Sequence, residues 1–435
     1  MVLIYNSALL LLSLSLFPYL ALRFLSEKKH RTGLLQRLGF IPRRILEKRS
    51  GKPVIWVHSV SVGEVLAAAP LIEQIRRQFP GYQLLLSTTT VTGHGVCLKK
   101  VATPDDLVIY FPLDIPFVVR RILALFSPRA VLLMETEIWP NLIREARRRR
   151  IPLLLVNGRL SEKSFQQYLR ARFFVRPLLH SFSFIGMQTE RGKLRMANLG
   201  APPAVLEVTG SMKYEAALAT VPSEAEVEAL RNDLAIPAEG VIVAGSTHRG
   251  EEQLVLRAYL ELRRKYADLF LILAPRHPER FAEVEDLLRQ RNVRFFLRSA
   301  RTKATSECRV MLLDTLGELA KFYALATVAF VGKSLTQRGG HNPLEPASCG
   351  KPVLFGPHMD NFREVAQVLA SEGGAVEVAD FHDLVSAFDR LLADGDSARE
   401  MGRRARKSVE SRTGCVNLTV TKLRHSLSTA TKTAR

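Results

Sequence analysis

The stretch from Gly339 to His358, GGHNPLEPASCGKPVLFGPH, contains residue types that could bind an anion. It lies between two short apolar runs that predict strands. Asn342 as N-cap, Pro343 as the first helical residue and Glu345 as the third-position acid would form a capping box. The same helix start would present backbone N–H groups to a phosphate. Helix capping and phosphate binding are therefore both open at this point.

Further polar and ionisable side chains follow other predicted strands. In the N-terminal half they occur in HSVSVGE, STTTVTGHG, ETEIWPN, NGRLSEKS and TGSMKYE, and in the C-terminal half in GSTHRGEE, PRHPERF and LGE. The carboxyl ends of parallel strands meet at one edge of an open α/β sheet, where ligands bind. The number of such loops predicts a ligand cleft between two domains.

The elements that position these loops alternate between strand-like and helix-like patterns. Strands are predicted at residues 53–60, 84–88, 130–134 and 153–157, with a helix at 65–79, and a second series comprises VIVAGST, LFLILAPRH, VMLLD, VAFVGKS and PVLFGPH. This pattern predicts an α/β protein with two Rossmann-like, doubly wound domains. The expected division is an N-terminal domain at 31–220, a linker at 221–240, a C-terminal domain at 241–412, and a C-terminal helix and tail at 413–435 that frays from Ser426.

The composition favours an anionic partner. The 435 residues include 62 Lys and Arg against 42 Asp and Glu, a formal charge of +20, which suits nucleic acid, anionic lipid or phosphorylated substrates. There is no RNP, zinc-finger or basic-zipper motif, so no nucleic-acid partner is expected. The scattered cysteines predict free thiols and no structural zinc: these are Cys97, Cys308, Cys349 and Cys415.

The N-terminus predicts a membrane anchor at residues 1–30. Residues 2–22 carry no charge and are long enough to cross a bilayer as a helix. Arg23, Lys28 and Lys29 follow the apolar run instead of preceding it, which indicates an uncleaved anchor with the body of the protein in the cytoplasm. A buried core helix, or a monotopic hairpin bent at Pro18, is the alternative.

Basic and aromatic residues also mix farther along the N-terminal half. Arg170, Arg172 and Arg176 surround Phe173, and Arg144 and Arg147 to Arg150 precede them. This pattern suits anionic inner-membrane lipids. A solvated helix face is the alternative interpretation.

The combination SVGE, ETEIWPN, NGRLS, GSMKYE, GSTH, PRHPERF and GGHNPLEPA, in this order behind the apolar N-terminus, resembles the 3-deoxy-D-manno-octulosonic acid (Kdo) transferases from about Arg31 to Arg412. The resemblance implies a GT-B architecture whose two Rossmann-like domains face a cleft. It also implies cytidine monophosphate-Kdo (CMP-Kdo) as donor, a lipid A precursor (lipid IVA) as acceptor, and a place in lipopolysaccharide core biosynthesis at the cytoplasmic face of the inner membrane. No cofactor is implied.

The resemblance also implies residue roles. Glu64 aligns with the general base of a single inverting displacement, although its position alone would only predict an offset of the helix dipole. Glu135 and Lys213 are implied to stabilise the transition state. The residues implied to bind the nucleotide are Pro275, Arg276, Leu316, Gly317, Glu318, Asn342, Pro343, Leu344 and Glu345. The chain departs from the family pattern at Lys333, where a second glycine is usual.

No metal is expected at this site, because protein cations and helix dipoles can offset the charge of a monophosphate leaving group. The DxD-like triplet Asp394-Gly395-Asp396 predicts a helix stop and turn, and the ten histidines form no HExxH pattern. The remaining alternative is another GT-B enzyme, a UDP-sugar transferase or epimerase.

Overall fold

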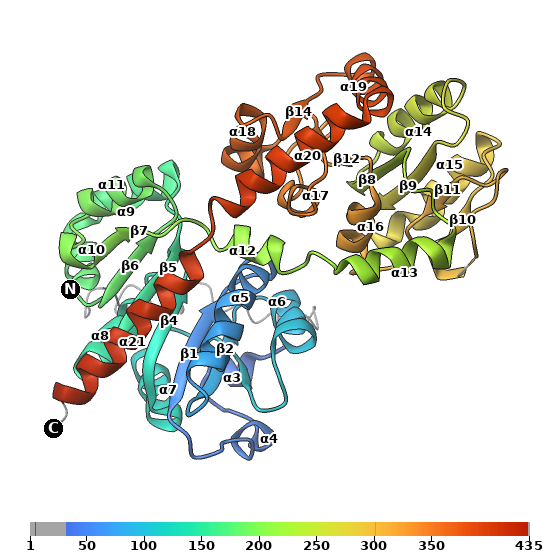
Figure 1. The fold of residues 1–435 in the computed structure, drawn as a ribbon. Coiled ribbons are helices and arrows are strands. Elements are labelled where there is room, and N and C mark those ends of the chain that lie inside the picture. The colour runs from blue at the N-terminus through green and yellow to red at the C-terminus, as the bar shows by residue number, and fades with distance from the viewer. Residues whose placement is uncertain (1–4, 6–31, 301, 434–435) are drawn as a thin grey trace, which may run out of the picture. The chain divides into compact units, whose positions relative to one another are not determined.

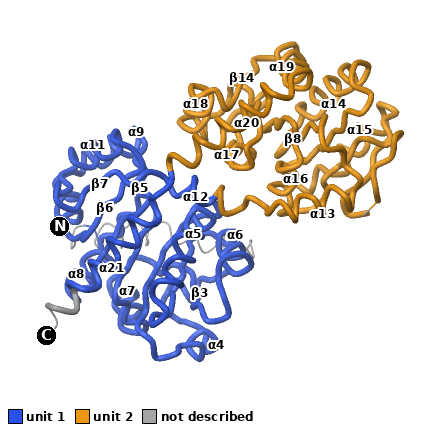
Figure 2. The backbone as a smooth tube through the Cα atoms, in the orientation of Figure 1, with its two compact units in different colours: residues 1–216, 413–435 blue, residues 217–412 orange. Residues whose placement is uncertain are grey.

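The computed structural model describes residues 5, 32–300 and 302–433, and the chain forms two compact units (Figures 1 and 2). Unit 1 comprises residues 1–216 and 413–435, and unit 2 comprises residues 217–412. The predicted membrane anchor lies outside the described residues, apart from residue 5. In the part of the chain that is described, no helix is both long and apolar enough to cross a membrane.

Unit 1 contains a seven-stranded parallel sheet in the order β3-β2-β1-β4-β5-β6-β7. Its strands are β1 (Val54–Ser59), β2 (Gln83–Thr88), β3 (Leu107–Tyr110), β4 (Pro128–Met134), β5 (Leu153–Gly158), β6 (Phe184–Met187) and β7 (Leu206–Val208). Every residue of β1, β2 and β5 is buried. This is expected of a parallel sheet with both faces covered, and the strands predicted in this half are confirmed.

Helices cover both faces of this sheet (Figure 1). They are α3 (Leu34–Arg37), α4 (Arg43–Leu46), α5 (Val62–Gln78), α6 (Val91–Val96), α7 (Pro116–Phe126), α8 (Pro140–Arg148), α9 (Glu162–Arg170), α10 (Arg172–Leu179), α11 (Glu190–Asn198), α12 (Lys213–Leu218) and α21 (Cys415–Thr433), with a π-helical turn at Cys97–Val101 and a 3-10 turn at Pro203–Val205. Trp56 packs in the core that contains Phe126 of α7, whereas Ile55 and Val57 pack in the core that contains α5 and α21. The alternation of side chains along β1 therefore builds two cores.

Helix α21 returns the C-terminus to unit 1. Its first turn is fixed by Glu215, whose Oε1 accepts hydrogen bonds from the N–H groups of Gly414 and Val416 at 2.8 and 3.1 Å. Leu423 and Leu427 are buried in the unit 1 core. The segment from Ser426, expected to fray, therefore continues as helix to residue 433, because its apolar face packs against the unit 1 core.

Unit 2 contains a second seven-stranded parallel sheet, in the order β10-β11-β9-β8-β12-β13-β14. Its strands are β8 (Val241–Thr247), β9 (Phe270–Pro275), β10 (Phe296–Leu297), β11 (Val310–Leu312), β12 (Val328–Val331), β13 (Val353–Phe355) and β14 (Ala375–Glu377). Its helices are α13 (Glu224–Leu234), α14 (Glu251–Leu262), α15 (Phe281–Gln290), α16 (Leu319–Leu325), α17 (Leu344–Ser348), α18 (Arg363–Ser371), α19 (Phe381–Ala393) and α20 (Gly395–Glu410), with 3-10 turns at Pro278–Arg280, Arg298–Ala300 and Asp360–Phe362. The five strands predicted in this half are confirmed.

The segment 221–240, expected as a linker, instead contains α13 of unit 2. Ser223 and Glu226 form a capping box at its start, and Leu234 is fully buried in the unit 2 core. The Ser-x-x-Glu signal was present in the sequence. The sequence pattern did not predict a helix here, because α13 is mostly polar and is stabilised by the packing of a few apolar residues.

His58 of β1 is fully buried. Its ring stacks on Phe111 with centroids 3.8 Å apart, and Nδ1 lies 3.1 Å from the Ser87 carbonyl oxygen. Burial lowers the pKa of His58 to about 3, against the opposing effect of the Ser87 hydrogen bond. The folded state therefore keeps this imidazole neutral at a pH at which the unfolded chain protonates it.

His58→Phe should flatten the pH dependence of unit 1 stability between pH 6.5 and 5. In the wild type the stabilisation is full above pH 6.5 and is lost toward pH 3, at about 1.4 kcal/mol per pH unit for one such histidine. Urea unfolding followed by tryptophan fluorescence measures this slope in unit 1, because Trp56 and Trp139 are the two tryptophans of the chain. The exposed His180 supplies the control, since His180→Phe should leave the slope unchanged. An unaltered slope in the His58 variant would contradict the prediction.

Candidate functional site

Near the middle of each sheet the strand order reverses. In unit 1 the reversal lies between β1 and β4, and in unit 2 between β8 and β12. Loops diverge on either side of such a switch point, and open α/β sheets bind ligands in the crevice that they leave. Glu64 and Glu135 follow β1 and β4, and His248 and Lys333 follow β8 and β12. Of these four residues, the sequence predicted Glu64 and Glu135 as site residues, and both lie at the unit 1 switch point.

Glu64 is held at the start of α5, which has Ser61 as its N-cap. One carboxylate oxygen accepts from the Val60 N–H at 2.8 Å, and the other accepts from the Ser61 hydroxyl at 3.1 Å. Each oxygen retains a lone pair for another donor. Burial raises the pKa of Glu64, the Val60 N–H opposes the rise, and the charge of Glu135 adds to it. Glu64 therefore does stabilise the start of α5, and its carboxylate can still accept a proton from a substrate.

Glu135 lies close enough to Glu64 for its charge to act on that carboxyl group. Its backbone is in the left-handed region, with φ of 56°, a conformation that non-glycine residues adopt rarely and that concentrates at functional sites.

Glu137 was not predicted as a site residue. Burial, followed by the charge of Glu64, raises the pKa of Glu137 to about 7. The second acid of ETE was the available signal, and three carboxyl groups therefore meet at this switch point.

Lys213 lies beyond the carboxyl end of another strand of the unit 1 sheet. It is the first residue of α12, after the edge strand β7. The loop before it runs back to β5, where the Met212 N–H donates to Asn157 Oδ1 at 3.0 Å. Asn157 is fully buried and has φ of 55°. Because β5 neighbours β4, this bond places the start of α12 one strand from the strand that carries Glu135.

In unit 2, two histidines face each other at the switch point. The Nε2 atoms of His248 and His341 are 3.0 Å apart, and their rings are stacked at 20°. His277, after β9, lies edge-on to His248 with centroids 5.2 Å apart. Burial lowers the pKa of His248 to about 4 and that of His341 to about 3, with further lowering by Arg276 and Lys333. The pair is therefore neutral at pH 7, with one ring donating and the other accepting.

Backbone hydrogen bonds join the beginning and the end of the loop that follows β12. The Gly340 N–H donates to the Lys333 carbonyl at 2.7 Å, and the His341 N–H donates to Gly332 at 3.2 Å. A Cβ on Gly332 would lie 2.4 Å from the Ser246 carbonyl oxygen, so only glycine allows this approach to the end of β8. The closure brings Lys333 and His341 to the same end of the loop.

The NPLE segment starts one residue later than expected. Helix α17 begins at Leu344, and Pro343 occupies the N-cap position, so the prediction of Asn342 as N-cap was wrong. Asn342 instead accepts from the Leu344 N–H at 3.2 Å, two residues on, and its amide donates to Glu345 Oε1 at 3.4 Å. This is an Asx-type turn, which still links Asn342 and Glu345.

The Leu316-Gly317-Glu318 turn, after β11, combines an anchored residue with an exposed one. Burial alone would raise the pKa of Glu318, but hydrogen bonds from the Thr315 hydroxyl and from Arg298, at 3.1 Å, hold it below its usual range. Gly317 has φ of 90°, and the Leu316 side chain is 68% exposed. The turn therefore presents an apolar group beside the end of β9, where Pro275 is the last strand residue and Arg276 follows.

Glu251, which sequence reasoning missed as a site residue, joins the two turns at the unit 2 switch point. It is fully buried. Its carboxylate accepts from four backbone N–H groups: those of His248 (2.9 Å), Lys333 (2.7 Å), Ser334 (2.9 Å) and Leu335 (3.0 Å). The only sequence signal was the acidic pair that opens α14 in GSTHRGEE. One side chain thus fixes the backbones that carry His248 and Lys333.

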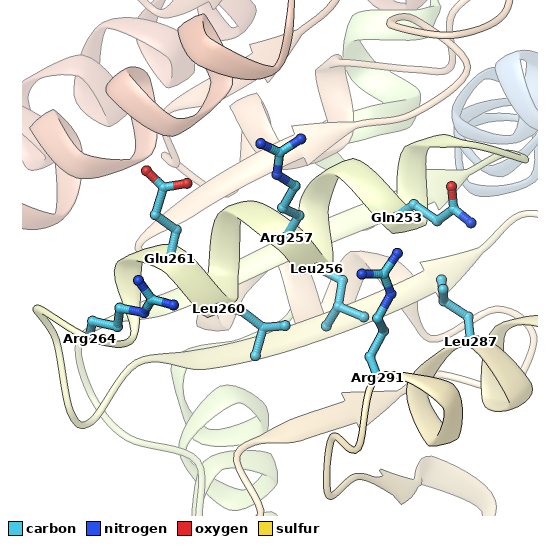
Figure 3. A pocket seen from close by; sticks show the side chains of 8 residues that line it. All are labelled: Gln253, Leu256, Arg257, Leu260, Glu261, Arg264, Leu287 and Arg291. Atoms are coloured by element: carbon cyan, nitrogen blue, oxygen red, sulfur yellow. The ribbon is translucent and has the colours of Figure 1, made fainter.

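Two other regions contribute little to the site. The predicted helix stop is confirmed, because α19 ends at Ala393, but the predicted turn is absent, because Gly395 already begins α20 with Asp394 as its N-cap, accepting from the Ser397 N–H. The described residues contain no cluster of acidic, histidine or cysteine side chains that could hold a metal ion. A groove of about 310 Å³ lies between α14 and α15 (Figure 3), where Leu256 and Leu260 point toward the side of Leu287. None of the predicted site residues lines it.

Comparison with known proteins identifies the family. Residues 32–216 match the family described as 3-Deoxy-D-manno-octulosonic-acid transferase (kdotransferase), and residues 253–408 match Glycosyl transferases group 1. The chain is 35% identical over 402 residues to a 3-deoxy-D-manno-octulosonic acid transferase of Haemophilus influenzae, covering 92% of both chains. It is 33% identical over 374 residues to the Bordetella pertussis protein of the same name, covering 84% of this chain and 86% of that protein.

The fold is shared more widely. A crystal structure of UDP-GlcNAc 2-epimerase from Neisseria meningitidis, bound to UDP-GlcNAc, has a TM-score of 0.58 and 16% identity, covering 85% of this chain and 99% of that chain. At this identity the likeness concerns the GT-B fold alone. The identity to transferases over nearly the whole chain is decisive for the family. The chain belongs to the 3-deoxy-D-manno-octulosonic acid (Kdo) transferases, glycosyltransferases of lipopolysaccharide biosynthesis with a GT-B fold.

Proposed function

We propose that this chain transfers Kdo from CMP-Kdo to a lipid A precursor, lipid IVA, with inversion at the anomeric carbon. The observation that carries the proposal is Glu64 at the unit 1 switch point, with a raised pKa and Glu135 nearby. Unit 2 supplies the residues expected to bind the nucleotide, among them Arg276 and Glu345. The family membership supports the donor and the acceptor as expectations.

In the proposed reaction, ionised Glu64 removes the proton from the attacking hydroxyl of the acceptor as the new glycosidic bond forms. The Val60 and Ser61 hydrogen bonds orient its carboxylate. Glu135 stabilises positive charge that develops on the Kdo ring, and Lys213 stabilises the departing phosphate. The bond to phosphate breaks in the same displacement, so no covalent Kdo–enzyme intermediate forms.

The test is a transfer assay with purified protein, CMP-Kdo and lipid IVA, in which mass spectrometry measures the addition of Kdo to the lipid. The principal alternative is a UDP-sugar transferase or epimerase, since an epimerase shares the fold. Incubation with each labelled nucleotide sugar separates the possibilities. Turnover of a UDP-sugar without turnover of CMP-Kdo would overturn the proposal.

We also propose that the protein acts on the cytoplasmic face of the inner membrane, with residues 1–30 as its anchor. A second membrane contact is expected around Phe173 of α10, whose side chain is 74% exposed. Arg170, Arg172 and Arg176 beside it are exposed as well. Aromatic insertion combined with attraction to anionic headgroups would hold this helix at the surface.

A protein lacking residues 1–30 should therefore sediment with anionic lipid vesicles at low salt and be released at high salt, because the electrostatic attraction is screened. Phe173→Ser should lower the bound fraction. Neutral phosphatidylcholine vesicles are the control and should bind little protein. Failure of the truncated protein to bind anionic vesicles at low salt would refute the second contact.

A further inference from the structure

The unit 2 switch point carries positive charge without a paired negative charge. Among the residues that the structure describes, the side chains of Arg276 and Lys333 form no ion pair. Arg280, also near His248, is by contrast paired with Glu252, its Nη2 lying 3.1 Å from Oε2. Unpaired cations held near each other repel, and a bound anion relieves that repulsion.

In the described part of the chain, the Glu251 carboxylate adjoins the backbone of Lys333 but forms no ion pair with its ammonium group. Both oxygens of Glu251 already accept backbone N–H groups, two each. The two imidazoles are uncharged at pH 7. Burial is the largest cause, a neighbouring histidine is the next, and the nearby lysine and arginine side chains add to the effect, so that the pKa is about 4 for His248 and about 3 for His341. Among the described cations that act on the dyad, Arg276 and Lys333 are therefore the two whose side chains form no ion pair.

Lys333 is built into the loop in a way that orients its side chain. Its φ of 58° is in the left-handed region, where a residue with a Cβ costs about 1–2 kcal/mol relative to the right-handed region. The Glu251 hydrogen bond to its N–H holds this backbone. Its stem passes over Gly339, where an added Cβ would lie 3.3 Å from Lys333 Cε and 3.6 Å from Cδ. The loop therefore fixes the backbone from which the Lys333 side chain extends past Gly339.

The two cations approach the dyad from different strands. Arg276 follows β9 and Lys333 follows β12, with β8 and His248 between them. Strand ends two positions apart are separated by about 10 Å, and both side chains are long enough to reach the space over β8. Each charge acts on His248 and His341. Two cationic residues that follow strands on either side of β8 therefore both act on the dyad.

We infer that Lys333 and Arg276 form a two-cation subsite beside the His248–His341 dyad, in which Lys333 binds the carboxylate of the donor sugar and Arg276 binds the phosphate. This inference rests on the proposed function. In CMP-Kdo the phosphate and the carboxylate are attached to the same anomeric carbon, so the donor presents two anions close together. A guanidinium can bind either anion through paired N–H donors, and an ammonium group can bind either as a point charge. Arg276 is assigned to the phosphate because it is among the residues expected to bind the nucleotide, which leaves the carboxylate for Lys333.

The test separates affinity for the whole donor from affinity for the nucleotide alone. Lys333→Met should raise the KM for CMP-Kdo at least about tenfold and leave the inhibition constant of cytidine monophosphate within about twofold. Arg276→Met should raise both. Lys333→Gly, which suits the left-handed backbone, should behave like Lys333→Met if the charge matters, and Lys333→Arg should restore most of the affinity.

Two results would overturn the inference. An equal rise in the inhibition constant of cytidine monophosphate in Lys333→Met would place Lys333 on the phosphate, and unchanged values for both ligands would exclude contact with the donor. If the wild-type protein does not turn over CMP-Kdo, the proposed function fails, and equilibrium titrations with free Kdo and with cytidine monophosphate replace the kinetics. The subsite then requires that Lys333→Met weaken the binding of free Kdo alone, and equal binding of Kdo by both proteins would refute it.

Discussion

Glu64→Gln should lower kcat at least about 10²-fold and leave the affinity for cytidine monophosphate nearly unchanged. Glutamine has the size of glutamate and can still accept the Val60 N–H bond, but it cannot remove a proton from the acceptor hydroxyl. The nucleotide site is expected in unit 2, whereas Glu64 is in unit 1. Steady-state transfer to lipid IVA measures the rate, and titration calorimetry measures nucleotide binding.

The pH profile distinguishes a base from a helix cap. Because burial and the charge of Glu135 raise the pKa of Glu64, wild-type activity should fall as the pH decreases through that raised pKa. The residual activity of the glutamine variant should not show this loss. Glu73→Gln, on the same helix and paired with Arg77 at 2.9 Å, is the control and should keep wild-type turnover. Near-normal turnover by Glu64→Gln would remove Glu64 from the mechanism.

Glu251→Ala should open the unit 2 switch point and destabilise it by roughly 3 kcal/mol or more. Hydrogen bonds to a charged group contribute about 1.5–3 kcal/mol each, and removal of a buried charged partner leaves the opposite groups unsatisfied. Four N–H groups lose their acceptor in this variant. Hydrogen exchange at the amides of His248 and of Lys333 to Leu335 should accelerate at least about 10²-fold.

Exchange at individual amides is the right measurement because it reports the local opening of unit 2 separately from unit 1. Glu261→Ala, at an exposed position of the same helix, is the matched control and should leave these amides protected. Glu251→Gln should be intermediate, since its carbonyl oxygen still accepts but its amide faces N–H donors. Full protection in Glu251→Ala would show that water or another acceptor replaces the carboxylate, contrary to this account.

The sequence by itself determined the secondary structure that local physics controls. The strands that were predicted in both sheets are mostly apolar runs, because parallel strands in the interior of a sheet are covered on both faces, whereas the edge strands β7 and β14 are short, contain a glutamate and are partly exposed. The expected linker at 221–240 and the fraying tail from Ser426 differ from the structure for a common reason. Helices α13 and α21 are stabilised by burying a few apolar residues, such as Leu234 and Leu427, against a core, and a local pattern does not reveal that packing.

Only the tertiary structure decided which polar residues meet. The sequence placed Glu64 and Glu135 after strands, but their proximity depends on β4 pairing with β1 instead of with β3, and strand order is a long-range property. The same holds for the His248–His341 dyad, whose members are 93 residues apart. The roles of Glu137 and Glu251 required burial and hydrogen-bond partners, which a residue's type and spacing do not contain. The residue types therefore defined the available chemistry, and the order of the strands determined where it is assembled.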